Sequence, residues 1–117
     1  MTVKRIVMDI AAESVEEVRR FYADVFELKT VMDHGWIATL SSGETAPVQV
    51  SIATEGGSGT PVPDASIEVD NIDVVYTRAK SLGYRIEYDL TEEPWGVRRF
   101  YLLDPTGKLL NVLSHQS

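Results

Sequence analysis

The sequence predicts an α+β fold in which one β–α–β–β–β unit occurs twice. A strand-like run of alternating polarity followed by an amphipathic helix occurs in each half of the chain, and three short strand-like runs follow each helix. A stretch rich in Gly, Ser and Pro separates the halves. We therefore interpret the 117 residues as a single domain made of module one (1–54), a linker (55–63) and module two (64–117).

The first strand of each module is predicted from its alternation. Residues 3–10 (VKRIVMDI) and residues 64–70 (DASIEVD) place apolar side chains on one face and mostly polar ones on the other. Side chains of a strand alternate between faces, so this pattern is typical of a strand with one buried face.

A helix is predicted after each of these strands, with recognisable ends. The first begins at Ser14, and Glu17 three residues later completes the pattern of a capping box. The second begins near Asn71, which is a good N-cap residue, and stops at Gly83. Apolar residues recur at helical spacing in both.

Three further strands complete each module. They are predicted at 29–32, 36–40 and 48–53 in module one, and at 84–89, 97–103 and 109–114 in module two. Between the last two, Asp104, Pro105 and Gly107 occupy the first, second and fourth positions of a type I turn. Neither four-stranded sheet can cover both of its faces with one helix. Two such sheets side by side would form one curved mixed sheet around a trough, with the helices outside, and the trough is the expected site.

Composition excludes several classes of function. The formal charge is −7, with carboxylates spread along the chain, which argues against a nucleic-acid surface. There is no cysteine, so a disulfide framework and a thiolate nucleophile are absent. No apolar run approaches the roughly 20 residues of a membrane span, and charged residues come too early for a signal peptide. We expect a cytoplasmic protein that does not bind membranes.

The paired modules, the segments FY and VFEL in the first helix, EEPWGVRRFY and the terminal DPTGKLLNVL together resemble the vicinal oxygen chelate superfamily. This superfamily includes glyoxalase I, extradiol dioxygenases, fosfomycin-resistance enzymes and bleomycin-resistance proteins. Its enzymes hold a divalent metal in the trough through His or Glu side chains. The resemblance implies that the four ligand positions correspond to Arg5, Gln49, Asp64 (or Ala65) and Asn111.

These residue types predict that no catalytic metal is bound. A catalytic site needs about three protein ligands, usually His or carboxylate. The Arg5 guanidinium has no lone pair to donate, and Gln49 and Asn111 are neutral amides, which are weak ligands. The two histidines, His34 and His115, lie in a turn and near the end of the sequence, where we expect surface residues. We therefore expect no metal and no cofactor.

Strand parity and the resemblance together define a polar lining for the trough. The candidate ligand-binding residues are Arg5, Gln49, Asp64, Glu68, Trp95, Arg99, Tyr101 and Asn111. Two interpretations remain open. In the first, these groups bind a small molecule and Trp95 and Tyr101 supply aromatic walls. In the second, Arg5 and Arg99 pair with Asp9, Asp64 or Glu68 and form a closed ion network.

The leading hypothesis is a metal-free protein that binds an unidentified small molecule, as the bleomycin-resistance proteins do. The alternatives are a glyoxalase- or dioxygenase-like metal-dependent enzyme with divergent ligands, an enzyme that uses Tyr101 and Glu68 for acid–base chemistry, and an interaction module with a vestigial pocket. We also expect a two-fold homodimer, because troughs in this superfamily are often completed across a dimer and small sheets expose edges that favour pairing.

Overall fold

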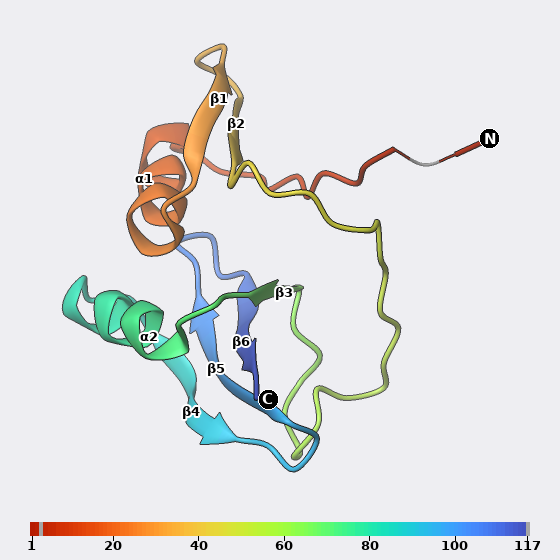
Figure 1. Cartoon of the computed structure of the whole chain (residues 1–117). Coiled ribbons are helices and arrows are strands. Elements are labelled where there is room, and N and C mark those ends of the chain that lie inside the picture. The colour runs from red at the N-terminus through yellow and green to blue at the C-terminus, as the bar shows by residue number, and fades with distance from the viewer. Residues whose placement is uncertain (3, 117) are drawn as a thin grey trace. The chain divides into compact units, whose positions relative to one another are not determined.

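The computed structural model describes residues 1–2 and 4–116, which form two units, Met1–Thr54 and Glu55–Ser117 (Figure 1). The elements of the described residues are α1 (Val15–Phe26), β1 (Lys29–Asp33), β2 (Ala38–Ser41), β3 (Ala65–Glu68), α2 (Ile72–Ser81), β4 (Ile86–Glu92), β5 (Val97–Leu103) and β6 (Leu109–His115). The predicted α+β class is confirmed. The segment predicted as a linker belongs to the second unit.

Unit one consists of α1 and the antiparallel hairpin β1–β2. The predicted N-cap is confirmed, because the Ser14 hydroxyl accepts a hydrogen bond of 3.2 Å from the amide of Glu17. The helix buries Phe21 and Val25 completely. It ends at Glu27, whose φ of 57° is left-handed, a conformation that favours glycine.

The strands expected at 3–10 and 48–53 are not formed, which corrects the β–α–β–β–β pattern for module one. Val3 lies outside the described residues, and none of the other residues of either segment is paired in a sheet. Their alternating side chains are exposed, with Val50 at 75% and Ile52 at 95%. Alternation records which face a strand would bury, but a strand also needs a neighbour for its backbone N–H and C=O groups. Among the described residues of unit one, these segments have no such neighbour.

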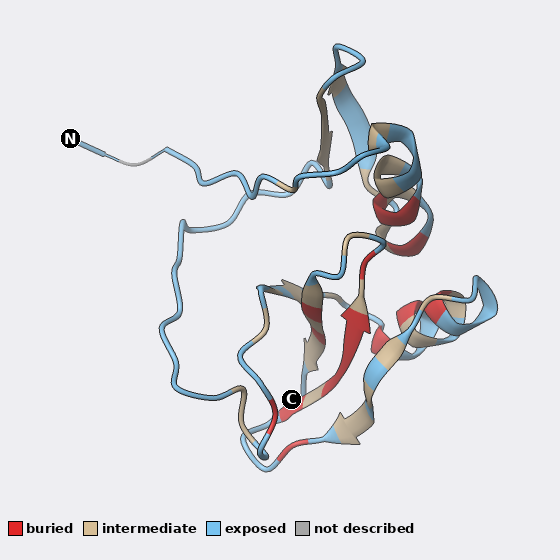
Figure 2. Ribbon diagram, turned by 180° about the vertical axis from the view of Figure 1, so that it is seen from behind, coloured by how far each residue is buried: buried red, intermediate tan, exposed pale blue. Residues whose placement is uncertain are grey.

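Unit two holds a four-stranded sheet in the order β3-β6-β5-β4, in which β3 runs parallel to β6 and the other pairs are antiparallel. Helix α2 covers one face, where the ring of Tyr76 meets Phe100 edge-on at 5.2 Å between centroids. Leu110 and Val112 of β6 are completely buried. Figure 2 shows that the buried residues of unit two lie mainly on the central strands and on α2.

The turn predicted between β5 and β6 is confirmed. The Gly107 amide donates to the Asp104 carbonyl at 3.0 Å. Oδ1 of Asp104 also accepts hydrogen bonds from the amides of Thr106 and Lys108 and from the Thr106 hydroxyl, at 2.7–2.9 Å. A tight turn fixes the register of its strands, so Tyr101 faces Asn111 across the β5–β6 pair.

We expect Asp104→Ala to lower the free energy of unfolding by about 2 kcal/mol, because three donors would lose a buried acceptor. Asp104→Asn keeps an oxygen at this position and should cost clearly less. Urea denaturation of the two variants tests this. An equal loss of unfolding free energy in both would mean that an uncharged oxygen acceptor at position 104 does not stabilise the turn.

Candidate functional site

The candidate site lies on the face of the unit-two sheet opposite α2, which we call the site face. Phe100 and Leu102 of β5 are buried toward the helix side, so strand alternation assigns Arg99 and Tyr101 to the site face. Asn111 of β6 faces Tyr101, and its Nδ2 donates to Ser66 of β3 at 3.1 Å. Three neighbouring strands therefore bring predicted lining residues to one surface.

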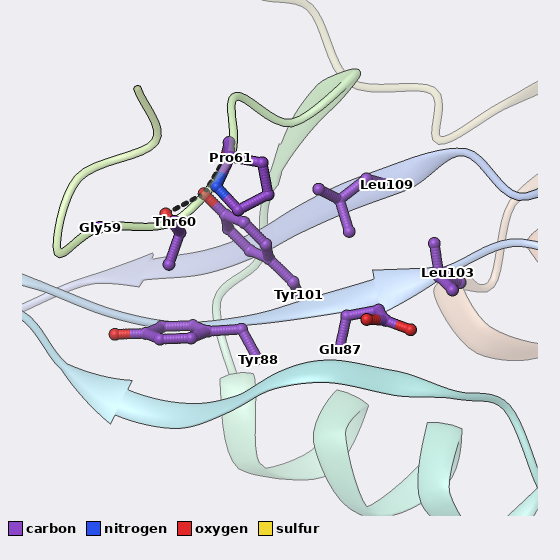
Figure 3. A pocket seen from close by; sticks show the side chains of 8 residues that line it. All are labelled: Gly59, Thr60, Pro61, Glu87, Tyr88, Tyr101, Leu103 and Leu109. Atoms are coloured by element: carbon purple, nitrogen blue, oxygen red, sulfur yellow. Dashed lines mark hydrogen bonds between the residues drawn. The ribbon is translucent and has the colours of Figure 1, made fainter. Parts of the chain in front are cut away.

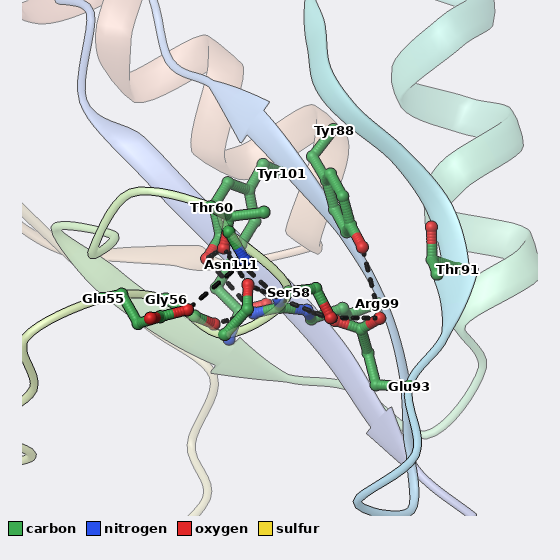
Figure 4. Close-up of polar contacts among 12 residues, drawn as sticks. Glu55, Gly56, Ser58, Thr60, Tyr88, Thr91, Glu93, Arg99, Tyr101 and Asn111 are labelled. Atoms are coloured by element: carbon green, nitrogen blue, oxygen red, sulfur yellow. Dashed lines mark hydrogen bonds and ion pairs between the residues drawn. The ribbon is translucent and has the colours of Figure 1, made fainter.

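A buried ion pair occupies the site face (Figure 4). Arg99 is 3% exposed and Glu93 is 7% exposed. Nε and Nη2 of Arg99 lie 2.9 and 2.7 Å from Oε2 of Glu93. The remaining guanidinium donors reach the carbonyl oxygens of Gly56 (2.8 Å) and Gly57 (3.2 Å) and the Tyr101 hydroxyl (3.1 Å). The positive charge is thus paired and its donors are satisfied, as a buried guanidinium requires.

The carboxylate and the guanidinium have further partners. Glu93 accepts hydrogen bonds from the Ser58 hydroxyl at 3.1 Å and from the Tyr88 hydroxyl at 3.2 Å. The rings of Tyr88, Trp95 and Tyr101 surround the guanidinium carbon of Arg99 at 5.0–5.3 Å from their centroids. These cation–π contacts add to the hydrogen bonds, so several residues hold the ion pair in place.

Residues 55–61, which we call the covering loop, close over this ion pair. The loop is held by bonds between Gly56 and Thr60 (2.8 Å) and between Thr60 and Gly57 (3.0 Å). The Tyr101 hydroxyl lies 2.9 Å from Oγ1 of Thr60 and donates to the carbonyl of Pro61 at 3.1 Å. A Cβ at Gly56 would come within 2.2 Å of the Tyr101 hydroxyl oxygen. Only glycine fits there, because the loop backbone lies directly against the tyrosine.

Of the two arginines in the predicted closed network, Arg99 forms a buried ion pair, although not with a predicted partner, whereas Arg5 is exposed and takes no part in this network. Arg99 pairs with Glu93, and not with Asp9, Asp64 or Glu68. Glu93 was not predicted because it is adjacent to Glu92, and nothing in the sequence distinguishes the buried carboxylate from the exposed one. The covering loop was not predicted because a Gly-rich segment between modules is typical of a linker. The Pro94 and Gly96 that follow Glu93 were the available signal that the chain turns back there.

Next to this network is a pocket of about 440 Å³ (Figure 3). The pocket is lined by Gly59, Thr60, Pro61, Glu87, Tyr88, Tyr101, Leu103 and Leu109. Two rings and two leucines make most of its wall apolar, as is usual for small-molecule sites. Thr60, Tyr88 and Tyr101 belong both to the pocket wall and to the network.

The remaining predicted site residues have local partners or lie elsewhere. Oδ2 of Asp64 accepts a hydrogen bond from the Leu109 amide at 2.8 Å. Glu68 pairs with His115 at 3.0 Å, on the exposed end of the sheet. Trp95 is half exposed and touches the network through Arg99. Arg5 and Gln49 are exposed and lie in unit one, in segments that form no strand.

Asn111 has one unusual feature, a buried Oδ1 atom without a hydrogen-bond partner among the described residues. An uncompensated buried acceptor is costly, so this atom is suited to receive a donor from water or from a ligand. The prediction that Asn111 lies on the same face as Tyr101 agrees with the register of β5 and β6.

The residues at the metal-ligand positions implied by the superfamily do not fit a divalent cation. Arg5 has no lone pair, and Gln49 and Asn111 each offer one amide oxygen. Asp64 is the one carboxylate among them, and its Oδ2 accepts a hydrogen bond from a backbone amide. In the described part of the chain, no three His, Cys, Asp or Glu side chains are grouped so that they could hold a metal ion. The helices of this same part include none that is long and apolar enough to cross a bilayer.

Fold and site together define a small α+β protein with a pocket against one face of a sheet. The family model of the Glyoxalase/Bleomycin resistance protein/Dioxygenase superfamily matches residues 3–112, and the chain belongs to this superfamily. The resemblance inferred from the sequence is thereby confirmed. A search of curated proteins found no match.

Several solved structures share the fold at low sequence identity. TioX from Micromonospora sp. ML1 is 20% identical, with 96% of each chain covered and a TM-score of 0.68. A lactoylglutathione lyase from Agrobacterium tumefaciens is 18% identical, with 97% of this chain and 92% of that chain covered and a TM-score of 0.64. A superfamily protein from Alicyclobacillus acidocaldarius is 19% identical, with 99% and 92% covered and a TM-score of 0.63. These similarities concern the fold alone.

We expect Arg99→Met to lower the free energy of unfolding by roughly 3–5 kcal/mol, because Glu93 would remain buried without its counter-charge. The matched control is Arg98→Met. Arg98 is the adjacent residue and pairs with Asp73 at the surface, so its loss should cost about 1 kcal/mol or less. Urea denaturation measures both. Equal, small losses would contradict a stabilising role for the buried pair.

Proposed function

We propose that this protein binds a small organic molecule in the pocket beside the covering loop. The observation that carries the proposal is the pocket of about 440 Å³, a volume within the range of small-molecule sites, with a largely apolar and aromatic wall. Membership of a superfamily that includes bleomycin-resistance proteins supports a binding role.

The rigidity of the pocket wall supports this proposal. The Tyr101 hydroxyl is held by Thr60, Arg99 and Pro61. The Tyr88 hydroxyl is held by Glu93. Side chains that are already ordered lose little conformational entropy when a ligand binds, so a preformed wall favours affinity.

We propose further that binding does not use a catalytic metal. The support is the donor chemistry at Arg5, Gln49, Asp64 and Asn111, which lacks the His and carboxylate set that such a metal needs. Acid–base catalysis by Tyr101 and Glu68 has little support, because the Tyr101 hydroxyl is engaged in the network while Glu68 pairs with His115. A binding protein accounts for these contacts with fewer assumptions than an enzyme does.

The partner we propose for the whole chain is a second copy. In unit one, the apolar side chains of Val48, Val50 and Ile52 alternate along an unpaired segment, and Ile6 and Met8 do so along another. Such segments bury their side chains and satisfy their backbone when they join the edge of a sheet. A two-fold homodimer would offer each copy that edge. A cytoplasmic location fits a chain without cysteine.

We expect a fragment screen by thermal shift to find ligands that stabilise the protein by about 2.7 kcal/mol at a hundredfold excess over the dissociation constant. Leu109→Trp should abolish this shift by filling the pocket. Leu113→Trp is the matched control, because Leu113 lies on the same strand and face but does not line the pocket. A screen without such ligands would instead favour an interaction module with a vestigial pocket.

We expect light scattering to give the mass of a dimer at micromolar concentration. The double variant Val50→Lys/Ile52→Lys should be a monomer, because charged residues prevent a strand edge from pairing. The control is the double variant Ser42→Lys/Thr45→Lys. These two positions are also exposed, and the substitutions add the same charge. A wild-type monomer, or equal dissociation of both double variants, would refute the proposed interface.

A further inference from the structure

Strand β4 carries two irregularities where it pairs with β5. Ile86 faces Leu102 and Tyr88 faces Tyr101, so β4 advances by two residues while β5 advances by one. Glu87 is the extra residue of this β-bulge. A bulge breaks the alternation of a strand and re-aims a side chain, and bulges are frequent beside functional sites. Here the consequence is that two successive residues, Glu87 and Tyr88, line the same pocket.

Glu87 differs from the other polar residues of the pocket wall. The hydroxyls of Thr60, Tyr88 and Tyr101 are used within the network. Among the described residues that line the pocket, Glu87 alone carries a charge at neutral pH. Its side chain is 32% exposed, so the carboxylate is partly withdrawn from water.

The present partner of this carboxylate is easily replaced. Nε of Arg85 lies 2.5 Å from Oε1 of Glu87, but the Arg85 side chain is 75% exposed and does not line the pocket. An exposed ion pair contributes little free energy, because water solvates both charges when the pair opens. A cation that enters the pocket can therefore take the place of Arg85 at a small cost.

We infer that the pocket selects an amphipathic cation, a molecule with an apolar or aromatic body and a protonated amine, and that Glu87 determines this specificity. This inference rests on the proposed binding function. The body would lie against Tyr88, Tyr101 and the two leucines, and the ammonium group would pair with Glu87. The net charge of −7 adds a field that attracts a cation and repels an anion.

Three probes of one shape test the inference: 2-naphthylmethylammonium, 2-naphthylmethanol and 2-naphthoate. Each probe is titrated into the full chain, and the chemical shifts of the backbone amides of Gly59, Leu103 and Leu109 are measured by NMR. We expect the cation to bind about fivefold more tightly than the alcohol at low salt, and the carboxylate to bind most weakly. Binding of the alcohol and the cation with equal affinity would refute the charge selection but leave the binding function intact. Failure of all three probes to shift these amides would count against the proposed function itself.

Three variants then separate Glu87 from the overall charge. In Glu87→Gln, the ammonium probe and the alcohol probe should bind with nearly equal affinity. Glu92→Gln removes the same charge from the same strand outside the pocket, and it should keep the preference. Arg85→Gln frees the carboxylate and should tighten binding of the cation, with no effect on the alcohol. Equal effects of Glu87→Gln and Glu92→Gln would mean that only the net charge matters, and this result would overturn the assignment of Glu87.

Discussion

The buried ion pair between Arg99 and Glu93 is the interaction on which unit two depends. Two charges removed from water are stable only if they pair closely and if further hydrogen bonds satisfy the remaining donors and acceptors. The backbone carbonyls of Gly56 and Gly57, and the hydroxyls of Ser58, Tyr88 and Tyr101, supply those bonds. Strands β4 and β5 and the covering loop thus all contribute hydrogen-bond partners to one pair of charged side chains. These bonds hold the two strands and the loop together.

The same requirement couples the stability of unit two to the pocket. Tyr88, Tyr101 and Thr60 satisfy the network with their hydroxyls and form the pocket wall with their rings and aliphatic atoms. A substitution that removes one of these side chains would therefore disturb both the network and the wall. Leu103, Leu109 and Glu87 line the pocket without taking part in the network. Substitutions at these three positions are therefore the ones that can change ligand binding while leaving the ion pair in place.

Local rules predicted much of the fold but little of the network. The caps at Ser14 and Asn71, the stop at Gly83 and the turn from Asp104 to Gly107 depend on neighbours within four residues, and all are present in the structure. Residues 3–10 and 48–53 show the limit of hydrophobic periodicity. It predicts which face of a strand is buried, but it does not predict whether a partner strand is present. The pairing of Arg99 with Glu93 depends on the irregular register of β4 and on a loop about forty residues earlier in the chain. Neither feature leaves a periodic signal in the sequence.

The residue types at the superfamily's metal positions fit this arrangement of charge. Tyr101 faces Asn111 across the β5–β6 pair, and its hydroxyl accepts a hydrogen bond from the Arg99 guanidinium. A divalent ion held at Asn111 would add positive charge to the sheet face that already holds the guanidinium of Arg99, which a single carboxylate neutralises. A carboxylate at position 111 would instead have no N–H group to donate to Ser66. The neutral amide avoids both costs, because Nδ2 bonds to Ser66 and Oδ1 remains available for a donor. The amide at 111 thus fits the hydrogen bonds of the site face, where one of its atoms serves Ser66 and the other is left for a further donor.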